Sequence, residues 1–170
     1  RHMIKIIAYK GRSLTSKAIK LLTRSEYSHV AFMFDDGSVV EAWDNHGLRK
    51  VSSISEQHSP DTEVDVFILP KLTAYQEHQL KQLIEVDLLN PAKYDWKMVF
   101  KFVPIVRLLT KNNEVNPDKF FCSEYVTERL LNVGFNLFNS NTKPYEVPPD
   151  WIPRSLAVSF VETLVTSSKA

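Results

Sequence analysis

The stretch Tyr27–Trp43, with the sequence YSHVAFMFDDGSVVEAW, decides how this chain is expected to fold. Two apolar runs rich in β-branched and aromatic residues flank an Asp-Asp-Gly turn at residues 35–37. That pattern predicts a β-hairpin with a glycine in its turn. The first run carries one histidine, His29, and the second carries one acid, Glu41.

The length of the turn decides whether these two side chains can meet, because side chains alternate between the two faces of a strand. A two-residue turn leaves His29 and Glu41 on opposite faces of the hairpin. A three-residue loop at 35–37 pairs Ala31 with Glu41 and makes His29 a diagonal neighbour on the same face. Gly37 stands where the three-residue loop requires a left-handed residue, so we expect this register. A slip of one residue would separate the pair.

Composition indicates one ordinary globular domain spanning residues 3–170. The chain has 170 residues, of which 44% are hydrophobic and 24% are charged, enough for a sizeable core. The net charge of +1 indicates no nucleic acid or other strongly anionic partner. Arg1-His2 before Met3 resembles a cloning scar. No signal peptide follows Met3 and no apolar run is long enough to span a membrane, so we expect a cytoplasmic protein unless a leader has been removed.

The order of the predicted elements indicates an α+β fold with a mainly antiparallel sheet. Residues 155–165 fit a strand or a helix, and periodicity does not decide between them. Helix signals include a Thr73–Gln76 capping box and a C-terminal Gly134. The predicted strands lie at Ile4–Tyr9, in the hairpin, within 48–54 and at Val64–Leu69. The predicted helices lie at Ser13–Arg24, from Thr73 to Asn90 and from Cys122 to Val133. The last helix places four apolar residues on one stripe: Cys122, Val126, Leu130 and Val133.

Cys122, within FFCSEYV, is the one cysteine of the chain, which excludes an intrachain disulfide and a four-cysteine zinc site. It stands at the start of the predicted third helix, where unpaired N–H groups and the helix dipole favour a thiolate. With His29 beside it and Glu41 orienting the imidazole, it would form a nucleophile ready for acyl transfer. His46 is a rival for the third position. The simpler interpretation of Cys122 is a buried thiol that acts as a small hydrophobe.

The segment HVAFMFDDGSVVEA resembles the histidine strand of NlpC-type cell-wall peptidases, in which a second polar residue lies twelve positions after the histidine. Glu41 lies twelve positions after His29. In those enzymes the cysteine helix precedes the hairpin, whereas here CSEY follows it. That order resembles the circularly permuted papain-like branch, which includes YiiX/YaeF-like proteins and is related to the lecithin:retinol acyltransferase group. The first strand, IKIIAYKG, lacks the Gly-Asp of the family pattern.

This resemblance implies a permuted papain-like (NlpC-type) fold, with an antiparallel sheet packed against helices and the cysteine at a helix N-terminus. It implies a cysteine amidase or peptidase-like hydrolase that needs no metal or cofactor, with Cys122, His29 and Glu41 as its catalytic residues. Tyr94 would serve as a substrate-binding residue or oxyanion donor, and residues 96–120 would be an insertion. The implied substrate is an amide in a peptidoglycan-like peptide or an N-acylated small molecule.

Other functions remain open on the same residues. A lipid-acting acyltransferase or thioesterase is suggested by the apolar residues 98–109, which we expect to pack beside the site as a helical element broken near Pro104. The basic residues around that segment fit a lipid surface or, more commonly, a solvated face; they are Lys97, Lys101, Arg107 and Lys111. A binding module without catalysis is a third possibility.

A zinc hydrolase using His29, Glu41 and His46 is the remaining alternative. It is disfavoured because no compact ligand motif such as HExxH is present. The other histidines, His58 and His78, are expected on the surface.

Overall fold

The computed structural model describes residues 3–11, 26–43, 47–89, 121–138, 141–144 and 147–168. Several sequence-based predictions therefore lie outside the described residues. They are the helix at 13–24, His46, Tyr94, and the insertion at 96–120 with its apolar residues 98–109 and its basic residues 97, 101, 107 and 111.

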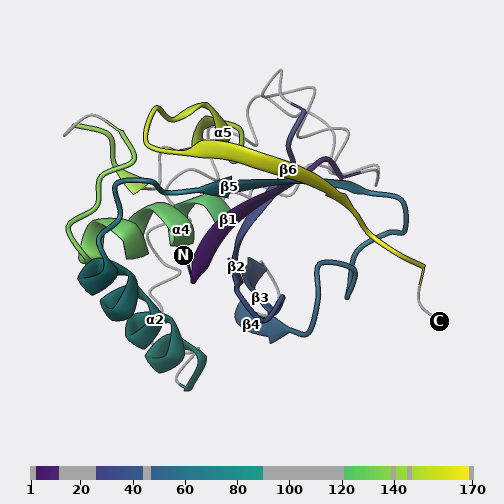
Figure 1. Ribbon diagram of the computed structural model, residues 1–170, viewed down its shortest axis with the longest axis horizontal. Coiled ribbons are helices and arrows are strands. Elements are labelled where there is room, and N and C mark those ends of the chain that lie inside the picture. Colours follow the sequence, from purple (N-terminus) through teal and green to yellow (C-terminus); the bar gives the residue numbers. More distant parts are fainter. Residues whose placement is uncertain are drawn as a thin grey trace, which may run out of the picture.

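The described chain forms a six-stranded sheet in the order β4-β3-β2-β1-β5-β6, and every neighbouring pair is antiparallel. Figure 1 shows β6 beside β5 at one edge and β4 at the other. The predicted α+β class with an antiparallel sheet is thus confirmed. The strands are β1 (Ile4–Tyr9), β2 (His29–Phe34), β3 (Val39–Trp43), β4 (Gly47–Val51), β5 (Glu63–Ile68) and β6 (Ser159–Val165).

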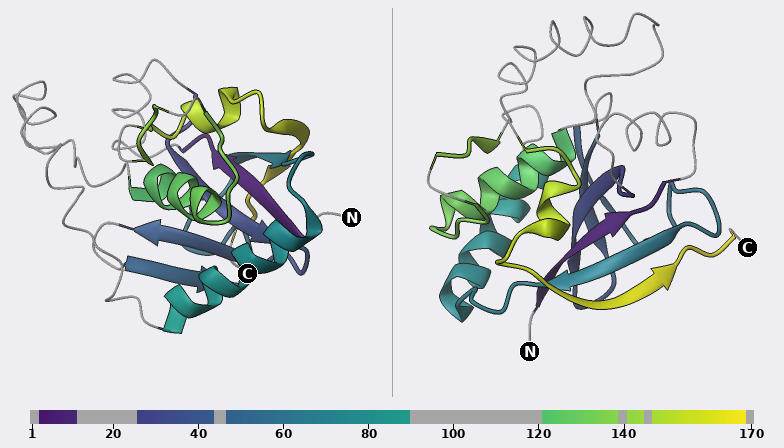
Figure 2. Two further views of the ribbon diagram at one scale, coloured as in Figure 1. Left: turned by 90° about the vertical axis from the view of Figure 1, so that its left-hand side faces the viewer. Right: turned by 90° about the horizontal axis from the view of Figure 1, so that it is seen from above.

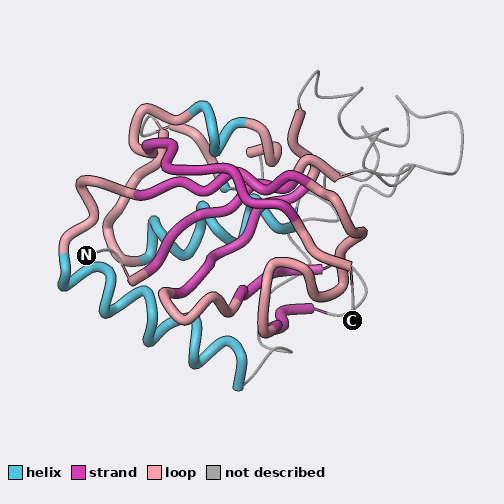
Figure 3. Tube along the Cα trace, turned by 45° about the vertical axis from the view of Figure 1, so that its right-hand side comes forward, coloured by secondary structure: helices cyan, strands magenta, loops and turns pink. Residues whose placement is uncertain are grey.

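Two long helices, α2 (Ala74–Leu89) and α4 (Phe121–Asn132), lie on the same side of this sheet, and the short α5 (Trp151–Arg154) follows. Figure 3 shows the two long helices in cyan along one side of the magenta strands. Among the described helices, none is long and apolar enough to cross a bilayer.

The signals that delimit the helices agree with the sequence. The backbone N–H of Thr73 donates to Gln76 Oε1 at 3.0 Å and that of Gln76 donates to Thr73 Oγ1 at 3.1 Å, as a capping box requires. Gly134 ends α4 with a φ of +78°, and the N–H of Phe135 bonds to the carbonyl of Leu130 at 2.9 Å. The predicted stripe is buried in the core, with Cys122, Val126 and Leu130 in α4 and Val133 directly after it.

The two faces of the sheet carry separate cores. On one side, here called the helix face, the strands pack against α2 and α4 through alternate residues such as Ile6, Phe32 and Val40. The opposite side, here called the loop face, carries a smaller cluster: Ile7, Tyr9, Ala31, Met33, Val39, Val51, Val64 and Val66, with Ile54 and Leu164 packed against it. Alternation along each strand divides the apolar residues between the two faces.

The hairpin between β2 and β3 has the predicted three-residue loop. Phe32 pairs with Val40 and Met33 with Val39, which places Ala31 opposite Glu41. Gly37 adopts a φ of +85°, the left-handed conformation that this loop requires. Glu41 therefore lies on the loop face, where the preferred register puts it.

Residues 52–62 connect β4 to β5 and lie against the loop face. Tyr9 donates its hydroxyl hydrogen to the carbonyl of Ile54 at 3.2 Å, and the Ile54 side chain packs on the loop-face core. The ends of the connection are tied to the residues after β6. Thr62 donates its N–H to Thr166 Oγ1 at 2.9 Å, and Ser167 donates its N–H to Ser55 Oγ at 2.9 Å.

Candidate functional site

Glu41 is the centre of the polar cluster on the loop face, and its side chain has no solvent exposure. Its direct neighbour across the β3–β4 pair is Arg49. The guanidinium donates to Glu41 Oε2 from Nη2 at 3.0 Å and from Nε at 3.3 Å. A buried carboxylate is costly unless it is paired, and this charge-assisted contact supplies part of that pairing.

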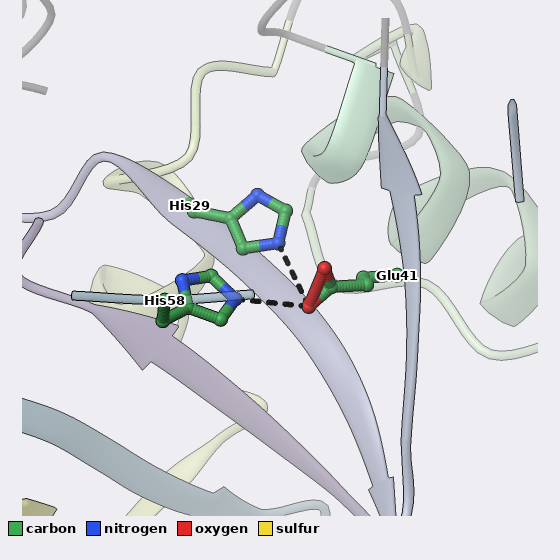
Figure 4. Close-up of side chains that lie close together, drawn as sticks. All are labelled: His29, Glu41 and His58. Atoms are coloured by element: carbon green, nitrogen blue, oxygen red, sulfur yellow. Dashed lines mark hydrogen bonds and ion pairs between the residues drawn. The ribbon is translucent and has the colours of Figure 1, made fainter. Parts of the chain in front are cut away.

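The other oxygen of Glu41 faces two histidines. His58 Nε2 lies 3.0 Å from Oε1, and His29 Nε2 lies 3.7 Å from the same atom. Figure 4 shows both rings directed at this oxygen, one from the start of β2 and one from the 52–62 connection. The His58 contact is short enough for a hydrogen bond. The His29 contact is longer and is an ion pair when the imidazole is protonated. The prediction that His29 and Glu41 share a face is therefore confirmed.

The prediction that His58 is a surface residue is wrong. Its side chain is only 10% exposed because its ring is stacked on Tyr9, with centroids 3.9 Å apart and planes at 13°. The polar sequence around it gave no sign of burial. The available signal was the length of the connection, since residues 52–62 exceed the usual four to six or so and long connections are often functional. His78, by contrast, is exposed as expected.

Cys122 is buried, at 2% exposure, in the helix-face core. Its sulfur nevertheless interacts with the His29 imidazole, through charge and through a side-chain hydrogen bond. The fold thus brings together all three residues singled out in the sequence. The described part of α4 begins at Phe121, and the predicted start of the helix extends to residues outside the described part.

Electrostatics assign different protonation states to the two histidines. Burial alone would lower the pKa of His29, but its charge interaction and hydrogen bond with Cys122, and then its contact with Glu41, raise it to about 10. Burial lowers the pKa of His58. The hydrogen bond from His58 to Glu41 raises this pKa, and the positive charge of His29 lowers it again. Burial would raise the pKa of Glu41, yet its contacts with His29 and His58 hold that pKa well below the usual range. At neutral pH the site therefore contains a charged His29, a neutral His58 and an ionised Glu41.

The same atoms match part of a metal site. One ligand atom each from His29, Glu41 and His58 lie within 4.8 Å of one another, and two imidazoles with one carboxylate suit zinc. Zinc needs neutral imidazoles, which the raised pKa of His29 opposes. The ion pair of Arg49 with Glu41 adds a second positive charge against a metal cation. In kind and number, the two imidazoles and the carboxylate match the ligands of a zinc site. His58 takes the position that the sequence suggested for His46.

No protein-family model and no curated protein matches this sequence significantly. Among solved structures, the fold is similar to that of the metalloprotein YiiX from Escherichia coli O157:H7, described as DUF1105. The two share 20% sequence identity with a TM-score of 0.62, over 95% of this chain and 96% of that chain. The resemblance to YiiX-like proteins is confirmed at the level of the fold.

Proposed function

We propose that this chain is a cysteine amidase or peptidase-like hydrolase of the permuted papain-like type. The observation that supports it best is the position of His29, whose imidazole interacts with the Cys122 sulfur and also lies 3.7 Å from Glu41. A thiol nucleophile that contacts a histidine base, which in turn contacts an orienting acid, is typical of thiol acyl-transfer sites. The proposed substrate is an amide in a peptidoglycan-like peptide or an N-acylated small molecule.

In the proposed resting state, Cys122 is a thiolate and His29 an imidazolium. Because Nε2 of His29 faces Glu41, we assign the Nδ1–H to the sulfur. We also assign Cys122 to the N-terminal turn of α4, where unpaired N–H groups and the helix dipole favour the anion. Glu41 holds the ring in this orientation, and Arg49 holds the other oxygen of Glu41 at 3.0 Å.

The reaction proceeds in two halves. The thiolate attacks the amide carbon and forms a C–S bond, and His29 gives its proton to the nitrogen as the C–N bond breaks and the amine leaves. Neutral His29 then takes a proton from water while the water oxygen attacks the thioester carbon. The C–S bond breaks, the acid leaves, and the thiolate–imidazolium pair is restored. The backbone N–H of Cys122 is the proposed oxyanion donor, and Tyr94 is a further candidate.

Iodoacetamide labelling tests this proposal directly, because Cys122 is the one cysteine in the chain. We expect wild-type protein to label rapidly at pH 6–7, and His29→Ala to label only as an ordinary thiol does, near pH 8.5. Cys122→Ser should not label and should lose turnover while keeping the fold. If wild type and His29→Ala both follow the ordinary thiol curve, the hydrolase proposal is wrong and the binding module becomes the better interpretation.

A lipid-acting acyltransferase of the same fold is separated from the hydrolase by its acyl donor. Intact-mass measurement after mixing with peptide, N-acyl and phospholipid donors shows which acyl group is transferred to Cys122. Acylation from phospholipid alone would favour the acyltransferase.

Metal binding is the second candidate function, favoured by the grouping of His29, Glu41 and His58 and by the description of YiiX as a metalloprotein. A bound zinc ion would supply Lewis-acid chemistry at this position. Elemental analysis of the purified protein decides between the candidates. Stoichiometric zinc that is lost in Glu41→Gln supports the metal site, and rapid Cys122 labelling unaffected by a chelator supports the thiol site.

A further inference from the structure

We propose that His58 is a positioning residue of this site, whose Nε2–H holds Glu41 Oε1 so that the carboxylate orients His29. The inference rests on the proposed function, since it assigns a role within the same thiol site. It adds a residue that neither the sequence pattern nor the comparison with YiiX identifies.

The first argument is the set of contacts on the carboxylate. His58 Nε2 is 3.0 Å from Oε1, whereas His29 Nε2 is 3.7 Å away. Arg49 holds the other oxygen, Oε2, at 3.0 Å. With one anchor on each oxygen, the carboxylate group cannot rotate about its terminal bond without breaking a hydrogen bond. Its orientation towards His29 is therefore set by His58 and Arg49 together.

The second argument is that His58 is itself held in place. Its ring lies flat on Tyr9 at 3.9 Å, and the Tyr9 hydroxyl is bonded to the carbonyl of Ile54 in the same connection. The ends of that connection are bonded to Thr166 and Ser167. A side chain fixed by packing and by bonded supports can orient another group accurately.

The third argument concerns protonation. A carboxylate oxygen can only accept, so an imidazole that hydrogen-bonds to it carries the hydrogen on the contacting nitrogen. The 3.0 Å contact therefore fixes the Nε2–H tautomer of His58. In this tautomer His58 donates to Glu41, so it acts through Glu41 rather than on the reacting atoms.

Two substitutions separate this role from simple filling of space. His58→Phe keeps an aromatic ring against Tyr9 but removes the N–H. His58→Gln loses the ring stacking but retains an N–H donor at a similar distance from the backbone. If His58 only fills space, Phe should be the better replacement; if it positions Glu41, Gln should be.

The experiment is the rate of iodoacetamide labelling of Cys122 against pH in the full chain, with circular dichroism and melting as checks of folding. We expect His58→Phe to move the midpoint of the labelling curve up by about one pH unit, which is about tenfold slower labelling below the midpoint. We expect His58→Gln to stay within about threefold of wild type, since about 0.6 kcal/mol corresponds to that factor. Unchanged or faster labelling in His58→Phe overturns the proposal, as does an equal loss in both variants.

The same series includes His29→Ala, so that the two proposals fail in different ways. If His29→Ala labels like wild type, there is no thiolate–imidazolium pair to orient and both proposals are wrong. If His29→Ala loses rapid labelling but His58→Phe does not, only the positioning role is wrong. Nitrogen chemical shifts of His58 in wild type give a check that needs no variant. A neutral ring protonated at Nε2 is expected, and one protonated at Nδ1 overturns the assignment.

Discussion

Glu41 and Asp87 are both held by an arginine and by aromatic side chains, one on the loop face and the other between α2 and α4. Asp87 accepts from Arg129 Nε at 2.6 Å, from Arg129 Nη2 at 3.1 Å and from the Tyr125 hydroxyl at 2.8 Å. Glu41 accepts from Arg49 and contacts two imidazoles. The two carboxylates differ chiefly in the kind of aromatic partner.

That difference decides what each cluster can do. Burial, and then the charge of Asp87, raise the pKa of Tyr125 above its ordinary value, and an arginine stays charged throughout. Tyr125 and Arg129, the partners of Asp87, therefore keep one protonation state at all physiological pH values, and their contacts join the two helices. The partners of Glu41 are histidines, which can change charge, and one of them contacts a thiol. The carboxylate–arginine pair is therefore common to both clusters, and the histidines and the thiol beside Glu41 are what single out the loop-face cluster as a candidate site.

The largest expected effect comes from removing one negative charge in each cluster. Asp87→Asn leaves Arg129, only 16% exposed, without its anionic partner, and should lower the free energy of unfolding by about 2–3 kcal/mol. Cys122 labelling should be unchanged in Asp87→Asn.

Glu41→Gln should slow Cys122 labelling, though less than His29→Ala does, because an amide oxygen still accepts from the ring. Urea unfolding and labelling rates on the same samples measure both effects.

Glu85→Gln is the control, because it removes an exposed acid from α2 and should alter neither quantity. Slower labelling in Asp87→Asn would contradict the distinction between the two clusters. So would normal labelling in Glu41→Gln.

The next effect is on the titration of His29. Its pKa is about 10, and the charge interaction with Cys122 is the largest cause that raises it. In Cys122→Ser that interaction is absent, so the pKa should fall by about one unit or more, or about 1.4 kcal/mol. NMR titration of the imidazole ring protons measures it. An unchanged value would mean that His29 is charged because of Glu41 alone.

A smaller effect is expected on acid stability. The folded pKa of Glu41 lies below its unfolded value of 4.5, so its contribution to stability is complete above that pH and is lost as the pH falls below it. The difference in free energy of unfolding between wild type and Glu41→Gln should therefore narrow by about 1 kcal/mol between pH 6 and pH 3. Urea unfolding at several pH values tests this. A difference that is constant with pH would show that Glu41 is not held ionised by its partners.

The smallest effects come from the two tyrosine hydroxyls. Tyr125→Phe removes a hydrogen bond to Asp87 and Tyr9→Phe removes one to the Ile54 carbonyl. Each should cost about 1 kcal/mol or less in unfolding free energy. Tyr9→Phe keeps the ring under His58, so labelling should change by less than about twofold. A large loss of labelling in Tyr9→Phe would mean that the hydroxyl, and not the stacked ring, holds His58 in place.

Local patterns predicted much of the fold. Gly37 in the turn fixed the hairpin register, the Thr73–Gln76 pair marked the start of α2, and the apolar stripe of α4 matched a helical period. The element at 155–165 was ambiguous for a physical reason. In β6 nearly every side chain is exposed, so neither a strand period nor a helix period appears in its sequence. Pairing with β5, a contact between distant residues, makes it a strand.

The sequence also predicted those residues of the candidate site that depend on local patterns. His29 and Glu41 follow from one hairpin, and the single cysteine before a helical stripe drew attention to Cys122. Arg49 depends on the register of a second hairpin, in which it stands opposite Glu41. His58 depends on how an irregular connection lies across the sheet and on its stacking against Tyr9. Such a contact leaves no periodic pattern in the sequence, so it could not be predicted from one.

The connection that carries His58 has a consequence for biosynthesis. Its bonds to Thr166 and Ser167 span 104 and 112 positions of the chain. At roughly 5–20 residues per second, a ribosome adds Thr166 roughly 5–20 seconds after Thr62. His29 and Glu41 are already in the nascent chain when that interval starts and Cys122 is added within it, so all three are made before the support that fixes His58. On the proposed role of His58, the thiol reaches full reactivity only after these late residues are made, and proteolytic removal of Thr166 and Ser167 should slow Cys122 labelling without a cut near the site.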